Sequence, residues 1–166
     1  SNGIKVKKEN LIKLSENFSK QLSKLQNKIF LCASSEFNIN STKQLGEIIF
    51  DKLKIPGAKK NKSGSFSTNS EVLETLAEQG YEIASLVLSW REISKLKNTY
   101  TESLTNNISN KTNRVHTTFQ MTGAQTGRFS SSDPNLQNIP IKSKNGPEIR
   151  TAFVSEEGYT LVCVDY

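Results

Sequence analysis

The sequence predicts an α+β fold, in which a long antiparallel helical hairpin with two short helices at its tip precedes a few antiparallel β-strands. Two observations predict it. Apolar residues recur every three or four positions through two long segments before residue 106, as on the buried face of an amphipathic helix. After that residue the pattern changes to short alternating runs separated by turn residues, which is typical of strands. We therefore expect a helical subdomain over residues 1–106 and a partial β-rich subdomain over residues 107–166.

The first long helix is predicted over residues 6–36 and the second over residues 81–104. Their apolar positions are Leu11, Leu14, Phe18, Leu22, Leu25, Ile29 and Cys32 in the first, and Ile83, Leu86, Val87, Trp90, Ile93, Leu96, Tyr100 and Leu104 in the second. A stripe of this length needs an apolar partner, so we expect the two helices to pack against each other. A homodimeric coiled coil stays open as the alternative.

Two capping boxes predict the short helices between them. Ser41-x-x-Gln44 begins one helix, which Ile55-Pro-Gly57 ends, and Thr68-x-x-Glu71 begins the other, which Gly80 ends. The basic linker over residues 58–67 is expected to be flexible. Its lysines, Lys59, Lys60 and Lys62, are either solvated or in contact with phosphates.

The β-rich part contains three expected strands. Residues 114–121 alternate, with Val115, Thr117, Phe119 and Met121 on one side. Residues 149–154 and 160–165 form the other two strands, joined by a turn at residues 157–158.

Charge and cysteine content narrow the class of protein. The 166 residues carry a formal net charge of +6, which fits either a solvated lysine-rich surface or binding to a polyanion. The two cysteines lie far apart, which indicates reduced thiols rather than a zinc site. The sequence has no signal peptide and no long apolar span, so we expect a cytoplasmic protein that does not enter a membrane.

Residues 126–140 are unusually rich in polar side chains. Arg128 offers a fork of donors, and the amides of Asn135, Gln137 and Asn138 each offer a donor and an acceptor. This set suits a polymeric ligand that carries many acceptors. Further on, the apolar run that begins at Thr160 ends in a carboxylate, which is a rigid place to hold a cation.

These residues carry a resemblance. The run Thr126-Gly-Arg-Phe-Ser-Ser-Ser-Asp-Pro-Asn-Leu-Gln-Asn-Ile-Pro140 resembles the palm motif of family A DNA polymerases, the bacterial DNA polymerase I type. The end of the chain, Val164-Asp165-Tyr166, is similar to the start of their motif A, and residues 37–45 and 95–100 resemble the thumb. The resemblance implies that residues 1–106 are a thumb and residues 107–166 a partial palm.

The resemblance also implies an activity: a DNA-directed DNA polymerase that binds primer–template DNA and adds dNTPs by two-metal phosphoryl transfer, in DNA replication and repair. It implies that Asp165 and the carbonyl of Tyr166 bind Mg²⁺, and that Arg128 lies against the primer-terminal base pair. The remaining DNA contacts that it implies are Arg91, Lys95, Lys97, Asn38, Asn40, Ser41, Asn135, Gln137 and Asn138.

Simpler roles stay open for several of these residues. Arg128 could be tethered to a local carboxylate such as Asp133, some of the loop amides could hold their own backbone, and Asn40 and Ser41 are also good helix caps. Asp165 alone cannot assemble a two-metal site, so we expect the fragment to be inactive. The parent is expected to be a monomeric bacterial enzyme associated with the nucleoid, and the alternative is a non-enzymatic nucleic-acid-binding module.

Overall fold

The computed structural model describes residues 2–61, 64–122, 127–140 and 146–162. They form two compact units. One comprises residues 1–19 and 95–166, and the other comprises residues 20–94. Helices α1 (Lys8–Ala33) and α4 (Glu82–Leu96) each belong in part to both units. The subdomain boundary that the sequence predicts at residue 106 stays a prediction.

The unit of residues 20–94 is helical. Helix α2 (Thr42–Gly46) continues into the π-helical segment η1 (Glu47–Lys52), and α3 (Ser70–Glu78) precedes α4. Their core also receives the C-terminal end of α1, through Ile29 and Ala33. The buried members from the other helices include Leu45, Ile49, Leu73, Ile83 and Val87. The two predicted short helices and the packing of the two long helices are therefore confirmed within this unit.

Helix α2 begins with half of the predicted capping box. The Ser41 hydroxyl accepts the backbone N–H of Gln44 at 3.3 Å. The Gln44 side chain does not bond back to Ser41 but accepts the N–H of Asn38 at 2.8 Å, so the chain ahead of the helix is held as well.

Helix α3 begins one residue later than its predicted box. The N-cap is Asn69, whose Oδ1 accepts the N–H of Val72 at 3.0 Å, and the prediction that Thr68 caps the helix is wrong. Thr68 is buried and is bonded to Arg91 instead. The predicted stop at Gly80 is confirmed, because its φ of +90° lets the next N–H reach the carbonyl of Leu76 at 3.1 Å.

The described part of the basic linker is more ordered than the sequence suggests. The Ser67 N–H donates to the carbonyl of Lys59 at 2.7 Å, and Lys60 and Phe66 form an antiparallel β-bridge. The Lys60 ammonium also lies 5.4 Å from the centre of the Phe66 ring. Lys62 lies outside the described residues.

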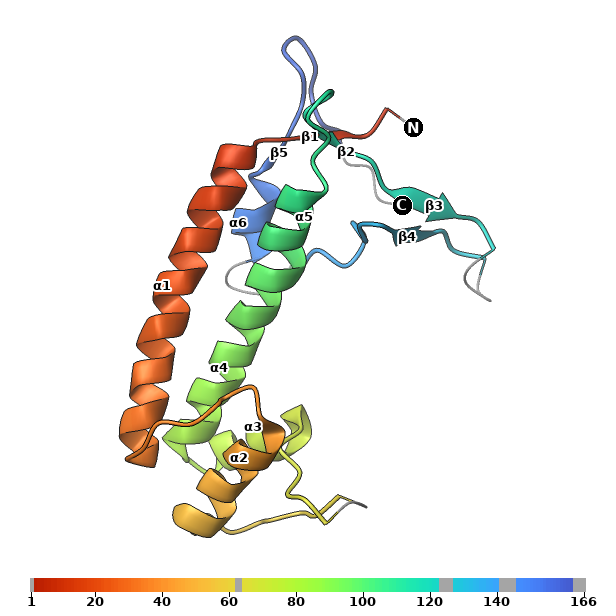
Figure 1. Ribbon diagram of the computed structural model, residues 1–166. Coiled ribbons are helices and arrows are strands. Elements are labelled where there is room, and N and C mark those ends of the chain that lie inside the picture. Colours follow the sequence, from red (N-terminus) through yellow and green to blue (C-terminus); the bar gives the residue numbers. More distant parts are fainter. Residues whose placement is uncertain (1, 62–63, 123–126, 141–145, 163–166) are drawn as a thin grey trace. The chain divides into compact units, whose positions relative to one another are not determined.

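The other unit contains the N-terminal half of α1. Beside it lie the π-helical segment η2 (Lys97–Glu102) and helix α5 (Ser103–Asn106), which continue directly from α4 (Figure 1). The apolar face of α1 is buried here through Leu11 and Phe18, both fully covered by the same chain. A homodimeric coiled coil would need that face to be free.

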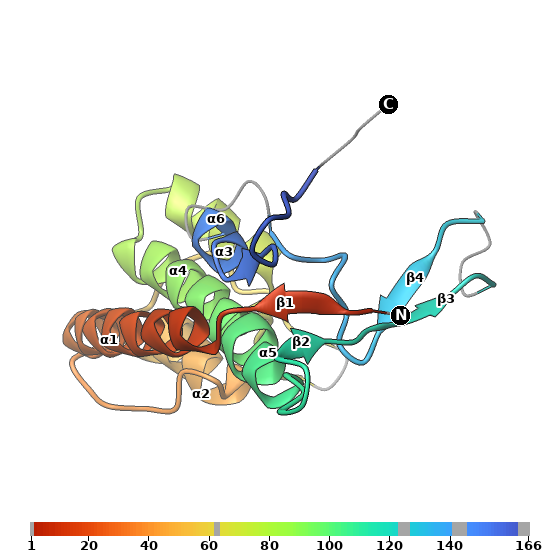
Figure 2. The same ribbon diagram turned by 90° about the horizontal axis from the view of Figure 1, so that it is seen from above.

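A small antiparallel sheet closes this unit, with the strand order β2–β1–β5. Strand β1 (Ile4–Val6), which the sequence analysis missed, pairs with β2 (Arg114–Val115) and β5 (Phe153–Val154). Figure 2 shows β1 and β2 side by side, although they are more than a hundred residues apart in the sequence.

A separate hairpin pairs β3 (Thr118–Gln120) with β4 (Ser130–Ser132). The single strand predicted over residues 114–121 is thus interrupted after Val115, where Thr117 turns its hydroxyl toward the following loop. The predicted side is buried at Val115, whereas Phe119 is 56% exposed. Strand β4 forms within a stretch that the sequence analysis treated as a loop.

The strand predicted over residues 149–154 is mostly wrong. Residues Gly146–Arg150 form helix α6, and only Phe153–Val154 are β. The reason is a tertiary one: Ile149 is fully buried in the helical conformation, and this packing is not visible in the local pattern of residues 149–154. Residues 160–162 form no strand, and residues 163–165 lie outside the described part. Among the described helices, none has both the length and the apolar character needed to cross a bilayer.

Candidate nucleic-acid interface

A chain of hydroxyl hydrogen bonds fixes the loop that follows β4. Ser131 Oγ accepts the N–H of Leu136 at 3.0 Å and lies 2.6 Å from Thr117 Oγ1, which donates to the carbonyl of Pro134 at 2.8 Å. Each hydroxyl has only one proton to give, so the order Leu136 to Ser131 to Thr117 to Pro134 satisfies every group. Ser131 is buried, and water therefore does not compete for these bonds.

Two of the three loop amides also hold the loop itself. Asn135 Oδ1 accepts the N–H of Gln137 at 2.9 Å, and Gln137 Nε2 donates to the carbonyl of Phe129 at 2.9 Å. The interpretation that some amides pin their own backbone is confirmed for these two. Asn138 differs, because its exposed side chain has no partner within the described residues.

Arg128 lies just ahead of β4 and is exposed. The described residues offer it no ion pair, and Asp133 does not tether it. Its positive charge is therefore available to a ligand. The neighbouring Phe129 is 58% exposed, so an apolar surface accompanies this charge.

In the unit of residues 20–94, the structure brings two of the predicted DNA contacts into one polar groove. Asn40 and Arg91 line this groove, whose volume is about 430 Å³. Further polar lining comes from residues that the sequence analysis did not select: Thr42, Asn61, Ser67 and Asn69.

Two hydrogen bonds to Thr68 hold the side chain of Arg91. Its Nη1 donates to the carbonyl of Thr68 at 2.5 Å, and its Nη2 donates to the hydroxyl of Thr68 at 3.2 Å. Partial burial lowers the pKa of Arg91 from the ordinary arginine value, but the group stays charged at any physiological pH. A guanidinium held on one side keeps its other N–H groups in a fixed orientation.

Local hydrogen bonds engage two of the three thumb-like residues ahead of α2, and the helix cap is Ser41, not Asn40. Ser41 caps the helix, and Asn38 Oδ1 accepts the N–H of Asn40 at 3.0 Å. The side chain of Asn40 has no bond in the described part of the chain, so its amide is free to serve a ligand.

The two predicted lysines differ. Lys95 is exposed and makes no ion pair with a described residue, whereas Lys97 lies 2.5 Å from Glu102 and is only 21% exposed. An anion would meet a free charge at Lys95 and a charge already neutralised at Lys97.

The predicted metal ligands, Asp165 and Tyr166, lie outside the described residues. In the described ranges, His, Cys, Asp and Glu side chains nowhere gather in threes as a metal site requires. Cys32 is free and half-buried, and burial, followed by the charge of Glu82, raises the pKa of its thiol; Cys163 is not among the described residues.

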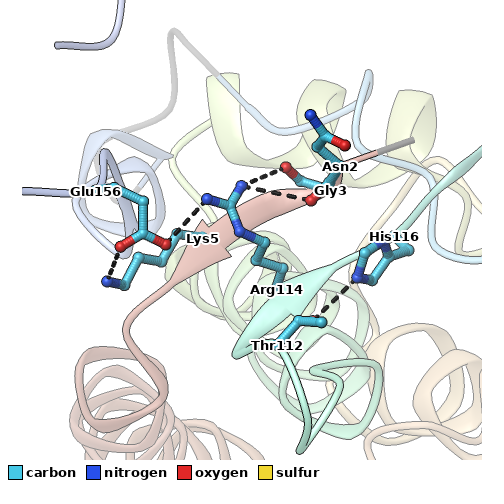
Figure 3. Close-up of polar contacts among 7 residues, drawn as sticks. All are labelled: Asn2, Gly3, Lys5, Thr112, Arg114, His116 and Glu156. Atoms are coloured by element: carbon cyan, nitrogen blue, oxygen red, sulfur yellow. Dashed lines mark hydrogen bonds and ion pairs between the residues drawn. The ribbon is translucent and has the colours of Figure 1, made fainter. Parts of the chain in front are cut away.

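A cluster of charged residues supports the three-stranded sheet (Figure 3). Glu156 lies 2.6 Å from Lys5 of β1 and 2.9 Å from Arg114 of β2, and Arg114 also donates to the carbonyl of Gly3 at 2.9 Å. The hydrogen bond from Lys5 is the largest effect and lowers the pKa of Glu156. Desolvation opposes it, and the hydrogen bond from Arg114 and the charges of Lys5 and Arg114 lower the pKa further. These residues border an open cleft of about 770 Å³, but their charges are already paired. The cluster therefore joins strands rather than binding a ligand.

Sequence reasoning missed the residues that hold the loop. Thr117 and Ser131 supply the hydroxyl chain, and Tyr100 donates its hydroxyl proton to the carbonyl of Asn138. The sequence does contain a signal for Tyr100. It lies on a predicted apolar helix face, and a buried tyrosine hydroxyl needs a hydrogen-bond partner.

Comparison with known proteins places the chain in a class. A family model described as DNA polymerase family A matches residues 8–166. The chain is 43% identical to DNA polymerase I of Rhizobium leguminosarum over 164 residues, which is 99% of this chain and 16% of that protein. It is 46% identical to DNA polymerase I of Caldicellulosiruptor bescii over 164 residues, 99% of this chain and 19% of the relative.

A solved structure agrees with this. The POL domain of Pol1 from M. smegmatis, in complex with DNA primer-template and dNTP, matches with a TM-score of 0.85 and 38% identity over 95% of this chain and 28% of that chain. The fold is thus that of a part of a polymerase domain, with the expected mixture of helices and antiparallel strands. The chain belongs to DNA polymerase family A, and it spans less than a fifth of the length of the two relatives named above.

Proposed function

We propose that this chain is the part of a DNA-directed DNA polymerase that holds the primer–template duplex at its growing end. The parent enzyme adds dNTPs to the primer by phosphoryl transfer, in DNA replication and repair. One observation supports this above the others. In a chain of DNA polymerase family A, Arg128 is exposed and unpaired among the described residues, beside a loop that a buried hydroxyl chain makes rigid.

Arg128 and Asn138 are the proposed contacts at the growing end. The minor groove presents acceptors at similar positions for every base pair, so an arginine there tests pairing geometry without reading the sequence. An amide offers both a donor and an acceptor at short reach, which suits the mixed edges of bases and sugars. Asn135 and Gln137 contribute through the amide atom that each leaves free.

Arg91 and Lys95 are the proposed contacts to the duplex backbone, with a smaller contribution from Lys97. Asn40, Asn38 and Ser41 are the proposed contacts near the minor groove. Binding to phosphates neutralises their charge and releases counterions, which gives a grip that is independent of sequence and weakens with salt. Lys97 contributes less than Lys95, because Glu102 already neutralises it.

Asp165 and the Tyr166 carbonyl are the proposed ligands of Mg²⁺. A carboxylate and a backbone carbonyl are both oxygen donors of the kind that Mg²⁺ accepts, so the residues fit the ion. When bound, the ions neutralise charge on the triphosphate and activate the primer hydroxyl. Asp165 holds its charge at the site, and the parent must supply at least one further acid, because one carboxylate cannot hold two ions.

We further propose that the parent is a monomeric, cytoplasmic enzyme associated with the nucleoid. The buried apolar face of α1 supports the monomer, because it leaves no long apolar stripe for a second copy. The M. smegmatis protein was solved with DNA primer-template and dNTP, and a structural match at 38% identity supports the same ligands here.

Binding of the 166-residue chain to fluorescent primer–template DNA tests the grip. Titrations between about 50 and 200 mM salt should give a slope of log K against log salt of about −0.9 for each neutralised phosphate. Lys95→Ala should make that slope shallower by about 0.9, and Lys97→Ala should change it less. Lys8→Ala, an exposed lysine at the start of α1, is the control. Absence of binding at every salt concentration would remove the proposal.

The parent enzyme tests the catalytic part. Asp165→Ala should abolish primer extension and leave the dissociation constant for primer–template DNA within about threefold of the wild type. Arg128→Ala should slow extension and weaken binding together. A non-enzymatic nucleic-acid-binding module predicts the opposite for Asp165→Ala, namely a variant that functions like the wild type.

A further inference from the structure

We infer that Tyr100 is a positioning residue for the primer–template site, and that it acts by fixing the backbone from which Asn138 presents its amide. The inference rests on the proposed function. Its observation is a single tertiary contact within one compact unit: the Tyr100 hydroxyl donates to the carbonyl of Asn138, 38 residues further along the chain.

Tyr100 reaches this carbonyl from a wide helical turn. In η2, the N–H of Ser103 donates to the carbonyl of Asn98, five residues earlier, instead of four as in an α-helix. A wider turn holds more residues, so steps of four keep the side chains of Leu96, Tyr100 and Leu104 on one buried face. Such segments are uncommon and often occur at functional sites.

Threonine hydroxyls support the wide turn. Thr101 Oγ1 donates to the carbonyl of Lys97 at 2.6 Å, and Thr105 Oγ1 donates to the carbonyl of Thr101 at 2.5 Å. These bonds satisfy carbonyls of the wide turn, where regular helical pairing is disturbed. Thr101 is fully buried, so its hydroxyl bond is protected from water.

The contact fixes a part of the loop that the hydroxyl chain does not reach. Thr117 and Ser131 bond to the loop as far as Leu136, and Tyr100 holds the carbonyl of Asn138. Asn138 is the loop amide whose side chain makes no bond in the described ranges, so its direction depends on its own backbone. Removing the Tyr100 hydroxyl would release that backbone while leaving the amide chemically intact.

The environment keeps Tyr100 a donor. Its side chain is only 4% exposed, and burial raises the pKa of its hydroxyl above the ordinary tyrosine value. A hydroxyl that stays protonated can donate to a carbonyl at every pH at which a polymerase works.

Tyr100→Phe in the parent enzyme tests the inference, because phenylalanine keeps the buried ring and removes only the hydroxyl. Tyr159→Phe is the matched control, since Tyr159 is 76% exposed and makes no side-chain hydrogen bond with a described residue. Tyr100→Phe should weaken primer–template affinity or slow incorporation about 2- to 10-fold, the effect of one hydrogen bond. Tyr159→Phe should match the wild type.

A double-mutant cycle separates positioning from a general loss of stability. Asn138→Ala should impair the wild type, but should add less than about twofold to Tyr100→Phe, because the amide is already misplaced there. In the isolated 166-residue chain, the carbonyl carbon of Asn138 should change its NMR chemical shift in Tyr100→Phe and not in Tyr159→Phe.

The outcomes distinguish the inference from the proposed function. A wild-type parent that neither binds nor extends primer–template DNA overturns both. If the wild type is active and Asn138→Ala is impaired, a Tyr100→Phe variant equal to the wild type overturns the inference alone. Fully additive effects, an Asn138→Ala variant equal to the wild type, or an unchanged carbonyl shift overturn it as well.

Discussion

Ser131→Ala should loosen the loop that carries the proposed DNA contacts. The substitution removes the acceptor for the N–H of Leu136 and the neighbour of the Thr117 hydroxyl. Thr117 keeps its bond to the carbonyl of Pro134, so its hydroxyl stays satisfied. The Leu136 N–H loses its acceptor, and leaving a backbone N–H without a hydrogen-bond partner costs about 1–3 kcal/mol.

Ser132→Ala is the control next door. The Ser132 hydroxyl is buried and has no hydrogen-bond partner among the described residues. Removing a polar atom that is buried without a bond costs nothing in lost bonding and relieves its desolvation. We therefore expect Ser132→Ala to be neutral or slightly stabilising. The two substitutions remove the same atom from adjacent residues, so their difference isolates the hydrogen bond.

Amide hydrogen exchange of the 15N-labelled chain measures the difference locally. In Ser131→Ala the Leu136 amide should exchange about 5- to 150-fold faster than in the wild type, which corresponds to the same 1–3 kcal/mol. In Ser132→Ala it should exchange at the wild-type rate or more slowly. Equal protection of Leu136 in all three proteins would refute the hydroxyl chain.

Three further predictions concern stability. Glu156→Gln should destabilise the sheet near neutral pH, because the lowered pKa of Glu156 stabilises the fold above the ordinary carboxyl pKa of about 4.3 and this stabilisation is lost as the pH falls through the lowered value. Thermal unfolding at several pH values should show the Tm difference between Glu156→Gln and the wild type closing in acid, and no Tm difference for Glu157→Gln. Gly46→Ala should lower the Tm, because the new Cβ would lie 2.7 Å from Cβ of Phe66. The resulting overpacking costs about 1–3 kcal/mol and outweighs a gain of about 1 kcal/mol in helix propensity, so a higher Tm would contradict this. Asn69→Ala should cost about 1 kcal/mol in urea unfolding followed by circular dichroism, because it removes the N-cap of α3, and an unchanged midpoint would show that another group caps the helix.

The cap of α3 shows where sequence reasoning stops. Thr68 and Asn69 are adjacent, both are good N-cap residues, and the capping-box pattern favoured Thr68. The choice falls to Asn69 because Arg91, 23 residues away, occupies both the hydroxyl and the carbonyl of Thr68. No local pattern contains that information.

Strand β1 and the loop amides give the same lesson. Three residues are too few to show a strand period, and β1 is stable only because β2 and β5 flank it from distant parts of the chain. Likewise, Asn135, Gln137 and Asn138 are alike as sequence letters. Only the folded loop shows which amides bond to the backbone and which one has no partner among the described residues.

The sequence by itself determined the two helical stripes, the cap at Ser41, the stop at Gly80 and the polymerase family. Each of these depends on residues within a few positions of one another or on an uninterrupted motif. The tertiary structure alone decided the pairing of β1, the helix at Gly146–Arg150 and the bond between Tyr100 and Asn138. These depend on contacts between groups that are distant in the sequence, and such contacts form only when the chain packs.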